Sequence, residues 1–391
     1  MRRSPRVLVA CGTRPEFVKL APVVKALAAC GLPVRTVATG QHYDLEMAGA
    51  FFEELGLRPD VRHELGGDEP ARLGGLVAQA ERELSEHAPD VVLLLGDTNT
   101  VPAYGLAARR RGLAVAHLEA GLRSFNERSM EETNRRVGAA AATLQLAPTE
   151  LARQFLLAEG VPERAIEVVG NPVIDLLVEM GVTALPHHER AGVLVTAHRA
   201  TNVDDPERLE LLVGLVDSLA AELGPVVFPV HPRTADRLRS TGLLARLERP
   251  GIDLLPPVPY GEMLGLVRSA RVVVTDSGGV QEEASFLGVP VVVLRTSTPR
   301  WEGVLLGTAR LVGLDQAAAL SAAAFFCEAR EQERVAATPC PYGDGRTGER
   351  VARLLSDEEV LERIRPKEPA LATGLPPAVS AVSARAGVVA P

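Results

Sequence analysis

The chain has 391 residues, of which 46% are hydrophobic and 24% are charged, and its 42 Lys and Arg side chains against 50 Asp and Glu side chains give a net charge of −8. This length predicts two or three domains, and the acidic balance without a basic block argues against bulk attraction to nucleic acid or an anionic membrane. Four cysteines without a Cys-x-x-Cys pair argue against a zinc site or a disulfide scaffold. No apolar run reaches the roughly 18 residues of a membrane span, so the cytoplasm is the expected location.

Short β-branched runs alternate with stretches of helical periodicity, which predicts βα units and parallel sheets with helices on both faces. Strands are expected in the first half at Val7–Ala10, Val34–Ala38, Val91–Leu95, Ala114–Leu118, Leu144–Leu146 and Ile166–Val169. In the second half they are expected at Val193–Val195, Val226–Val230, Ile252–Leu255, Val272–Val274 and Val291–Leu294. The polar stretch Ala184–Arg190 separates the halves. We therefore expect α/β domains over residues 1–184 and 185–355, and over 356–391 a helix end followed by a solvated, proline-containing tail.

The first candidate site residues follow the first expected strand, where ligands bind in open α/β sheets. Arg14 and Lys19 belong to the segment Gly12-Thr13-Arg14-Pro15-Glu16 and the helical turn after it. Proline at the start of a helix is pre-set in its φ angle, so both cations would lie near a helix N-terminus, which favours anions. An ordinary strand-to-helix turn with surface cations is the alternative interpretation.

Three acids follow, each near the carboxyl end of a strand. Asp97 comes after the third expected strand, Glu119 after the fourth, and Glu131 lies shortly downstream. Clustered carboxylates repel one another, so one of them can keep its proton near neutral pH and act as an acid or base. Taken singly, such an acid is more often a helix cap or an ion-pair partner, but three at one sheet edge favour a functional role.

The second half adds two histidines directly after strands. His198, followed by Arg199, is placed to carry a proton or to bind a phosphate, whereas His231 is as well explained by a structural hydrogen bond.

The strongest local pattern is Asp276–Glu283, which follows Val272–Thr275. Gly278 and Gly279 let backbone N–H groups approach a phosphate at a helix N-terminus, and Ser277 adds a hydroxyl. Glu283 could bind the vicinal hydroxyls of a ribose, and the cations Arg295 and Arg300 follow the next strand. The pattern predicts a nucleotide-diphosphate site. Because neither a dinucleotide-binding nor a P-loop glycine motif occurs where it is needed, hydride transfer and kinase chemistry are excluded.

Taken together, these motifs resemble the non-hydrolysing UDP-N-acetylglucosamine 2-epimerases over roughly residues 6 to 355. The matching segments, in order, are Gly12–Glu16 with Lys19, Thr39–His42, Gly96–Thr98, Glu119–Arg123, Glu131–Glu132 with Asn134–Arg135, Gly170–Asn171 with Asp175, Thr196–Arg199, Asp276–Glu283, Arg300 with Glu302, Gly307–Thr308, and Pro341–Gly345.

This resemblance implies the GT-B architecture, with two Rossmann-like doubly wound domains, the active site in the cleft between them, and a homodimer. It implies reversible epimerisation at C2 of a UDP-N-acetylated hexosamine, by elimination of UDP to a 2-acetamidoglucal and re-addition, with neither metal nor NAD. The implied acid–base residues are Asp97, Glu119, Glu131 and His198. The implied substrate contacts are Arg14, Lys19, Arg123, Arg199, His231, Ser277, Gly278, Gly279, Glu283 and Arg300. Gln41 and His42 match part of an allosteric UDP-GlcNAc site.

The chain departs from the family pattern at three places, one of which is the absence of a proline just before Glu131. Thr201 and Pro299 stand where the family commonly has glutamates, and the only tryptophan, Trp301, lies beside the second of these. These departures leave open a modified UDP-sugar as substrate, and which carboxylate takes the C2 proton is also open. Three alternatives stand beside the epimerase: a hydrolysing 2-epimerase that releases N-acetylmannosamine and UDP, a GT-B glycosyltransferase, and a nucleotide-sugar binding module that has lost catalysis.

Overall fold

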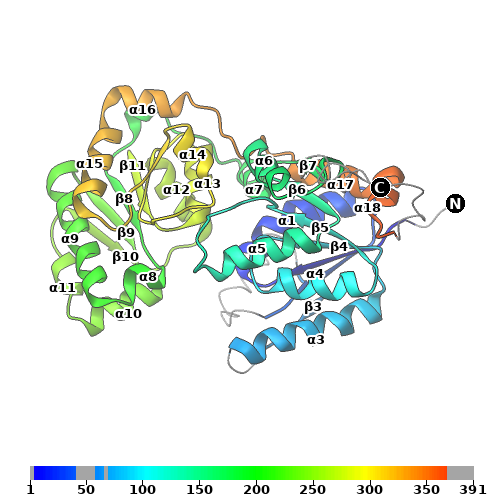
Figure 1. The fold of residues 1–391 in the computed structure, drawn as a ribbon. Helices are drawn as coiled ribbons and strands as arrows, with labels where there is room; N and C mark the ends of the chain where they lie inside the picture. Colours follow the sequence, from blue (N-terminus) through cyan, green and yellow to red (C-terminus); the bar gives the residue numbers. More distant parts are fainter. Residues whose placement is uncertain (1–3, 41–57, 66–68, 368–391) are drawn as a thin grey trace, which may run out of the picture.

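The structure is a computed structural model that describes residues 4–40, 58–65 and 69–367. Two parallel sheets, each with helices on both faces, lie side by side (Figure 1). This arrangement confirms the predicted α/β architecture. Gln41, His42 and the tail from residue 368 lie outside the described residues, so the expectations for them stay predictions.

Seven strands form the first sheet, in the spatial order β3-β2-β1-β4-β5-β6-β7. Its central strands are buried along their whole length, as expected where helices cover both faces of a parallel sheet. Its elements are β1 Val7–Cys11, α1 Arg14–Ala29, β2 Val34–Ala38, β3 Val61–Arg62, α3 Glu69–His87, β4 Val91–Leu95, α4 Thr100–Arg110, β5 Ala114–Leu118, α5 Met130–Ala141, β6 Leu144–Ala147, α6 Glu150–Ala158, a 3-10 turn Glu163–Ala165, β7 Ile166–Val168 and α7 Pro172–Glu179.

Six strands form the second sheet, in the order β10-β9-β8-β11-β12-β13. After a 3-10 turn at His187–Glu189, its elements are β8 Val193–Thr196, α8 Ala200–Val203, α9 Pro206–Leu223, β9 Val226–Pro229, α10 Pro232–Ser240, α11 Leu244–Leu247, β10 Ile252–Leu255, α12 Tyr260–Ser269, β11 Val272–Thr275, α13 Gly278–Phe286, β12 Val291–Val293, α14 Trp301–Leu305, β13 Ala309–Leu311, α15 Gln316–Cys327 and α16 Ala329–Ala336.

The strand order reverses once in each sheet. In the first sheet the reversal lies between β1 and β4, and in the second it lies between β8 and β11. The loops that leave such a pair of strands run to opposite faces and open a crevice at the carboxyl ends of the strands. Each half therefore offers one crevice, and the predicted site residues follow these strands.

The last two described helices return to the first sheet (Figure 1). These are α17 Thr347–Ser356 and α18 Glu358–Ile364. Val351, Leu355 and Ile364 are buried in the same core as α1 and β1, and the Asp175 carboxylate accepts hydrogen bonds from the backbone N–H groups that begin α17. The expected domain boundary at residue 355 falls inside α17 and would assign most of that helix to the second half. The apolar faces of α17 and α18 instead cover the first half.

Among the described helices, none is both long enough and apolar enough to cross a membrane.

Candidate active site

Five side chains from both halves form a buried ionic cluster. The Lys19 ammonium donates to Glu119 Oε1 at 2.6 Å and to Glu282 Oε2 at 2.9 Å. Arg300 pairs with the same two acids, through Nε to Glu282 Oε1 at 2.9 Å and through Nη2 to Glu119 Oε2 at 3.5 Å. The Asn171 amide donates to Glu119 at 3.1 Å and to Glu282 at 2.9 Å. Two cations thus balance two carboxylates, and ion pairs join α1 of the first half to α13 of the second.

Glu119 enters this cluster with an unusual backbone conformation. It follows β5 directly and has a φ of 58°, in the left-handed region that is costly for residues other than glycine. Burial raises the pKa of Glu119, but Lys19 and Arg300 outweigh burial and hold it at about 2. Glu119 is therefore ionised at neutral pH and supplies a fixed negative charge.

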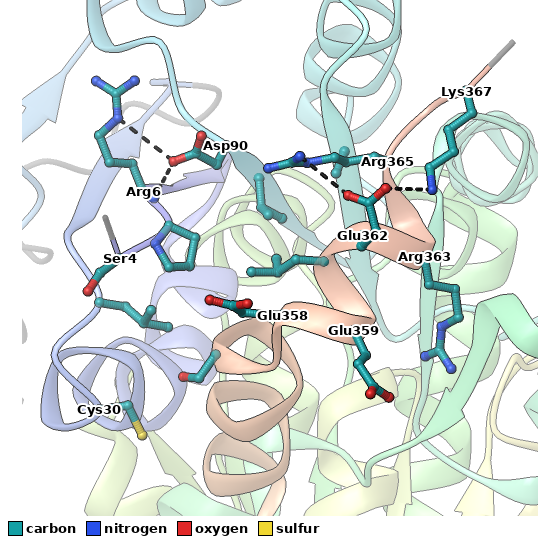
Figure 2. Close-up of a pocket in the computed structure, with 16 residues that line it drawn as sticks. Ser4, Arg6, Cys30, Asp90, Glu358, Glu359, Glu362, Arg363, Arg365 and Lys367 are labelled. Atoms are coloured by element: carbon teal, nitrogen blue, oxygen red, sulfur yellow. Dashed lines mark hydrogen bonds and ion pairs between the residues drawn. The ribbon is translucent and has the colours of Figure 1, made fainter. Parts of the chain in front are cut away.

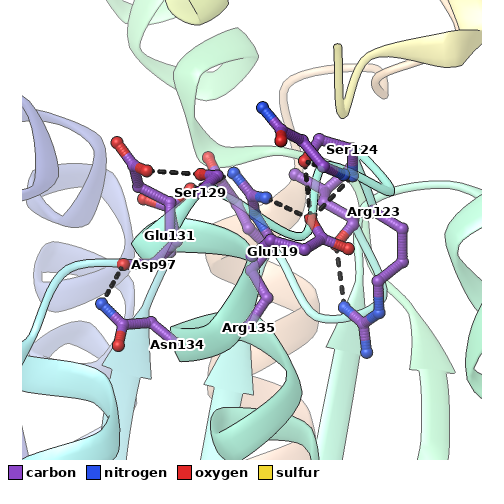
Figure 3. A network of polar contacts seen from close by, with 12 residues as sticks. Asp97, Glu119, Arg123, Ser124, Ser129, Glu131, Asn134 and Arg135 are labelled. Atoms are coloured by element: carbon purple, nitrogen blue, oxygen red, sulfur yellow. Dashed lines mark hydrogen bonds and ion pairs between the residues drawn. The ribbon is translucent and has the colours of Figure 1, made fainter. Parts of the chain in front are cut away.

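A second network holds Asp97 at the end of β4 (Figure 3). Arg135 donates through Nη2 to Asp97 Oδ2 at 2.5 Å and through Nη1 to Glu132 Oε2 at 2.7 Å. The Asn134 amide donates to the Asp97 carbonyl at 2.9 Å. The Asp97 side chain is still 29% exposed. Asp97 is therefore fixed in position and yet reachable from solvent.

Glu131 stands at the start of α5 and faces the second half. Its Oε2 accepts a hydrogen bond from Ser129 Oγ at 2.5 Å (Figure 3). Its Oε1 lies 3.8 Å from Arg199 Nη1. Burial raises the pKa of Glu131, but the Ser129 bond and the nearby arginines outweigh burial and lower it. Glu131 is thus a carboxylate beside a cation of the opposite half.

His198 follows β8 and is held by Asp276, which is fully buried after β11. The Asp276 carboxylate accepts from the backbone N–H groups of His198 and Arg199 and lies 3.3 Å from His198 Nδ1. Burial lowers the pKa of His198, and Asp276 opposes this effect only in part. The ring is therefore neutral at pH 7, and its side chain is 39% exposed.

His231 lies next to this histidine, with ring centroids 5.3 Å apart. Its Nδ1 accepts a hydrogen bond from the backbone N–H of Arg233 at 3.2 Å and so caps α10. This contact agrees with the sequence-based interpretation of His231 as a residue that makes a structural hydrogen bond. Because its ring lies beside that of His198, His231 is still part of the candidate site.

The N-terminus of α13 carries the predicted nucleotide contacts. Ser277 precedes the helix, which begins at Gly278 and Gly279. A Cβ at Gly278 would lie 3.2 Å from Arg300 Nη1 and 3.3 Å from Arg300 Cζ. Glycine therefore lets the Arg300 guanidinium pack against the start of the helix, where the helix dipole also favours an anion.

Glu283 points to the other side of α13 from Glu282. Its Oε1 accepts a hydrogen bond from the Tyr260 hydroxyl at 2.9 Å. Burial raises the pKa of Glu283 to about 7, although Tyr260 and Lys19 oppose the rise. Neighbouring glutamates on one helix thus face different surroundings: Glu282 is paired with Lys19 and Arg300, whereas Glu283 forms no ion pair with a cation that the structure describes.

Arg295, which follows β12, forms no ion pair with an acid of the described residues. Burial, together with the charges of the nearby Arg199 and Arg300, lowers the pKa of Arg295 to about 10, against an opposing effect of Glu131. Its Nη1 is buried and makes no hydrogen bond to any residue in the described ranges. A buried guanidinium of this kind is suited to an anionic ligand.

One predicted contact is not brought into this arrangement, and a second cannot be placed among the described side chains. Arg123 is fully buried, and its guanidinium donates through Nε and Nη2 to Glu159 at 2.7 and 2.6 Å and through Nη1 to the Leu122 carbonyl. These bonds give the Arg123 side chain a structural role in its loop. The backbone carbonyl of Arg123 accepts a hydrogen bond from Trp301 Nε1 at 2.9 Å. The side chain of Arg14 lies outside what the structure describes, so its predicted contact stays a prediction.

Several residues gain a role that the sequence did not assign. All but Tyr260 lie inside the matching motifs, but only the fold shows which way each side chain points. These residues are Glu16, Glu132, Asn134, Arg135, Asn171, Tyr260, Asp276 and Glu282.

A separate pocket lies at the opposite end of the first sheet (Figure 2). It is lined by residues that precede strands, such as Arg6 and Asp90, and by residues of α18 and the segment after it. Its charges pair with one another, as Arg6 does with Asp90 and Lys367 with Glu362. Because ligands of parallel α/β sheets bind at the carboxyl ends of strands, we do not place the active site here.

Comparison with known proteins decides the family. A family model described as UDP-N-acetylglucosamine 2-epimerase matches residues 25–356, most of the chain. The chain belongs to the UDP-N-acetylglucosamine 2-epimerase family. A UDP-N-acetylglucosamine 2-epimerase of Methanocaldococcus jannaschii is 36% identical to this family member in an alignment of 367 residues, and the match covers 90% of this chain and 99% of the relative.

Two further comparisons bear on the fold and the substrate. The crystal structure of the M. jannaschii UDP-GlcNAc 2-epimerase in complex with UDP-GlcNAc and UDP matches with a TM-score of 0.81 and 36% identity, covering 90% of this chain and 99% of that one. A UDP-2,3-diacetamido-2,3-dideoxy-D-glucuronate 2-epimerase of Pseudomonas aeruginosa is 37% identical over 317 residues, 79% of this chain and 88% of the relative. The predictions of epimerase family and fold are confirmed; the roles of single residues stay predictions.

Proposed function

We propose that the protein epimerises C2 of a UDP-N-acetylated hexosamine, interconverting UDP-GlcNAc and UDP-ManNAc or a modified analogue. UDP leaves from C1 as the C2 proton is removed, and it then adds back to the bound 2-acetamidoglucal. The observation that carries this proposal is the charge arrangement at the two crevices. Carboxylates on the first half face a helix N-terminus and cations on the second half, within a family of UDP-GlcNAc 2-epimerases.

The second half is suited to the diphosphate. Arg300 lies against the start of α13, and Arg295 offers a buried Nη1 that no described residue accepts from. Negative charge develops on the departing diphosphate, and fixed cations and helix-end N–H groups stabilise it without reorganisation. Ser277, Gly278, Gly279 and Arg300 are our proposed phosphate contacts, with Lys19, Arg199 and Arg295 beside them.

The acid–base work falls to the side chains that remain reachable. Asp97, Glu131 and His198 each keep part of their surface exposed, whereas Glu119 is buried and paired. A neutral His198 can accept a proton at one ring nitrogen and donate a hydrogen bond through the N–H of the other, and the two carboxylates can accept a proton. We therefore propose that Asp97, Glu131 and His198 reach the sugar and that Glu119 orients Lys19 and Arg300.

Glu283 remains our candidate for the ribose hydroxyls. Its Oε1 is engaged by Tyr260, which fixes the carboxyl group while leaving its second oxygen for a ligand hydroxyl. A carboxyl with a pKa near 7 can accept a hydrogen bond or donate one, which suits a diol.

The test is incubation with UDP-GlcNAc in deuterium oxide, followed by proton and phosphorus NMR. Deuterium at C2 together with UDP-ManNAc supports the epimerase. Steady accumulation of free UDP would indicate the hydrolysing reaction instead, and UDP-GlcNAc binding without exchange would indicate a module that has lost catalysis.

A modified substrate is the second candidate, supported by two features of this chain. Thr201 and Pro299 replace family acids, and the P. aeruginosa relative carries the name of a UDP-diacetamido-uronate epimerase. The arginines near Glu131 could pair with a sugar carboxylate. Comparing kcat/KM for UDP-GlcNAc and for UDP-2,3-diacetamido-2,3-dideoxyglucuronate distinguishes the two substrates.

We also propose a cytoplasmic homodimer, and for both features the family resemblance is the support. Sedimentation velocity measures the assembly. Allosteric binding of UDP-GlcNAc near Gln41 and His42 is a further proposal, which sigmoidal dependence of the rate on UDP-GlcNAc would support.

A further inference from the structure

Glu16 is a buried acid that the mechanism above does not use. It lies in the first turn of α1, and its Oε2 accepts hydrogen bonds from the backbone N–H groups of Gly12 at 2.6 Å and Thr13 at 3.1 Å. These bonds anchor one oxygen, as in a helix capping box. The whole residue is only 7% exposed. A helix cap needs no more than this single oxygen, so the position of the other oxygen calls for its own explanation.

The other oxygen, Oε1, faces Gly96, the residue before Asp97. It is buried and makes no well-formed hydrogen bond to a residue that the structure describes, and the Thr98 hydroxyl, buried and likewise without a well-formed partner, lies near enough to lower the pKa of Glu16. A Cβ built at Gly96 would lie 3.4 Å from Glu16 Oε1 and 4.0 Å from Glu119 Oε2. Gly96, with a φ of +74°, thus leaves open the space that these two carboxyl groups face. Asp97 follows Gly96 directly.

The two carboxyl groups beside Gly96 differ in charge. Glu119 is paired with Lys19 and Arg300, whereas no cation pairs with Glu16 within the described ranges. Burial raises the pKa of Glu16 to about 7, against the lowering effect of its backbone hydrogen bonds. This value includes the raising effect of the Asp97 charge, and the buried Cys11 thiol on β1 faces Glu16 without a charge at neutral pH. Acids whose environments separate their pKa values in this way commonly have different roles in proton transfer.

The proposed reaction gives such a group a use. When a proton is taken from one face of C2 and another is delivered to the opposite face, one protein group ends the turnover with an extra proton and another lacks one. Before the next turnover in the same direction these protons must be restored, either by exchange with solvent or by direct transfer within the protein. A buried carboxyl that can hold or release a proton at neutral pH, close to Asp97, is suited to that transfer.

We propose that Glu16 is a proton-relay residue, whose Oε1 exchanges a proton with Asp97 and so resets the site between turnovers. In this transfer an O–H bond forms at one carboxyl as the O–H bond at the other breaks, with no change in oxidation state. Glu16 acts through Asp97 and does not touch the sugar. This inference rests on the proposed epimerase function.

The test uses the full-length Glu16→Gln variant, in which a side-chain carbonyl can still accept from Gly12 and Thr13 while no proton is carried. With UDP-GlcNAc as the probe, rapid-quench kinetics should show a burst of about one product per site at the wild-type rate. Steady-state turnover should then be at least roughly tenfold slower, and the change in the kcat profile near pH 7 should disappear. The wild type should show no burst.

Asp175→Asn is the matched control. Asp175 is also buried near the start of a helix and accepts from two backbone N–H groups, those of Thr347 and Gly348 at 3.0 and 2.7 Å. The Asp175→Asn variant should unfold at a lower temperature and should show no burst of product. Calorimetric titration with UDP verifies that both variants are folded.

Three outcomes would overturn the relay while leaving the epimerase intact. These are unchanged steady-state turnover in the Glu16→Gln variant, equal slowing of the first and later turnovers, and a burst in the Asp175→Asn control. Failure of the wild type to exchange deuterium at C2 would instead refute the proposed function itself, so the two failures are distinguishable.

Discussion

Replacing Asp276 by asparagine tests whether this buried carboxylate both holds the second crevice together and prepares His198. The Asp276 carboxylate accepts from the backbone N–H groups of His198 and Arg199, at 3.1 and 3.0 Å, and from the Asn202 amide at 3.1 Å. An asparagine turns these charge-assisted bonds into neutral ones, at a cost of about 1 kcal/mol each. The three bonds predict a loss of about 3 kcal/mol, or a Tm lower by roughly 6 to 12 °C.

The same substitution should change catalysis through His198. Its ring loses the carboxylate 3.3 Å from Nδ1, so its orientation is no longer fixed and kcat should fall roughly 100-fold. Burial lowers the pKa of His198 and Asp276 opposes this, so removing the charge lowers the pKa further. The histidine then stays neutral to a lower pH, and the acid limb of the kcat profile should move to lower pH.

The assays are thermal unfolding by circular dichroism and kcat across pH 5 to 9 with UDP-GlcNAc. Asp217→Asn on α9 is the control, because Asp217 pairs with Arg246 and Arg249 at the surface, away from the site. A fall in Tm with an unchanged acid limb would refute the link between Asp276 and His198.

Three further substitutions separate structural from ligand-binding roles. Arg123→Met should lower stability by about 2 kcal/mol, because the buried guanidinium pairs with the part-exposed Glu159, and it should leave the Kd for UDP unchanged in calorimetry. Arg295→Met should weaken UDP binding at least tenfold and leave Tm equal or higher, because it removes a buried cation that forms no ion pair with a described acid; a large fall in Tm would contradict this. Trp301→Phe loses the bond to the Arg123 carbonyl, about 1 kcal/mol, so UDP should bind up to fivefold more weakly; unchanged fluorescence of the wild-type tryptophan on UDP addition would contradict a place beside the UDP site.

The sequence predicts the long, buried strands well because each is a continuous apolar run. The short strands β3 and β13 contain two and three residues and show no such run. Only their pairing with the neighbouring strands β2 and β12 in the structure identifies them as strands. The helices α17 and α18 have apolar faces in the sequence, but periodicity does not say which sheet those faces cover. Packing against α1 decides that they belong to the first core.

The site shows the same division at the level of single residues. Position after a strand was enough to select Asp97, Glu119 and His198, because parallel strands bring their carboxyl ends to one edge. It could not distinguish Glu282 from Glu283, whose neighbouring Cα atoms direct the side chains to different faces of α13. It also selected Arg123, whose guanidinium the fold turns toward Glu159.

The sequence by itself determined the family, the two parallel sheets and the group of acids and cations that meet between them. Periodicity and short motifs are local properties, so they can be recognised in the sequence without knowledge of the fold. The tertiary structure decided the pairing of those charges: Glu119 with Lys19 and Arg300, Asp97 with Arg135, and Glu16 with no cation in the described ranges. Burial and neighbouring charge set the protonation of each acid, and both come from residues far apart in the chain.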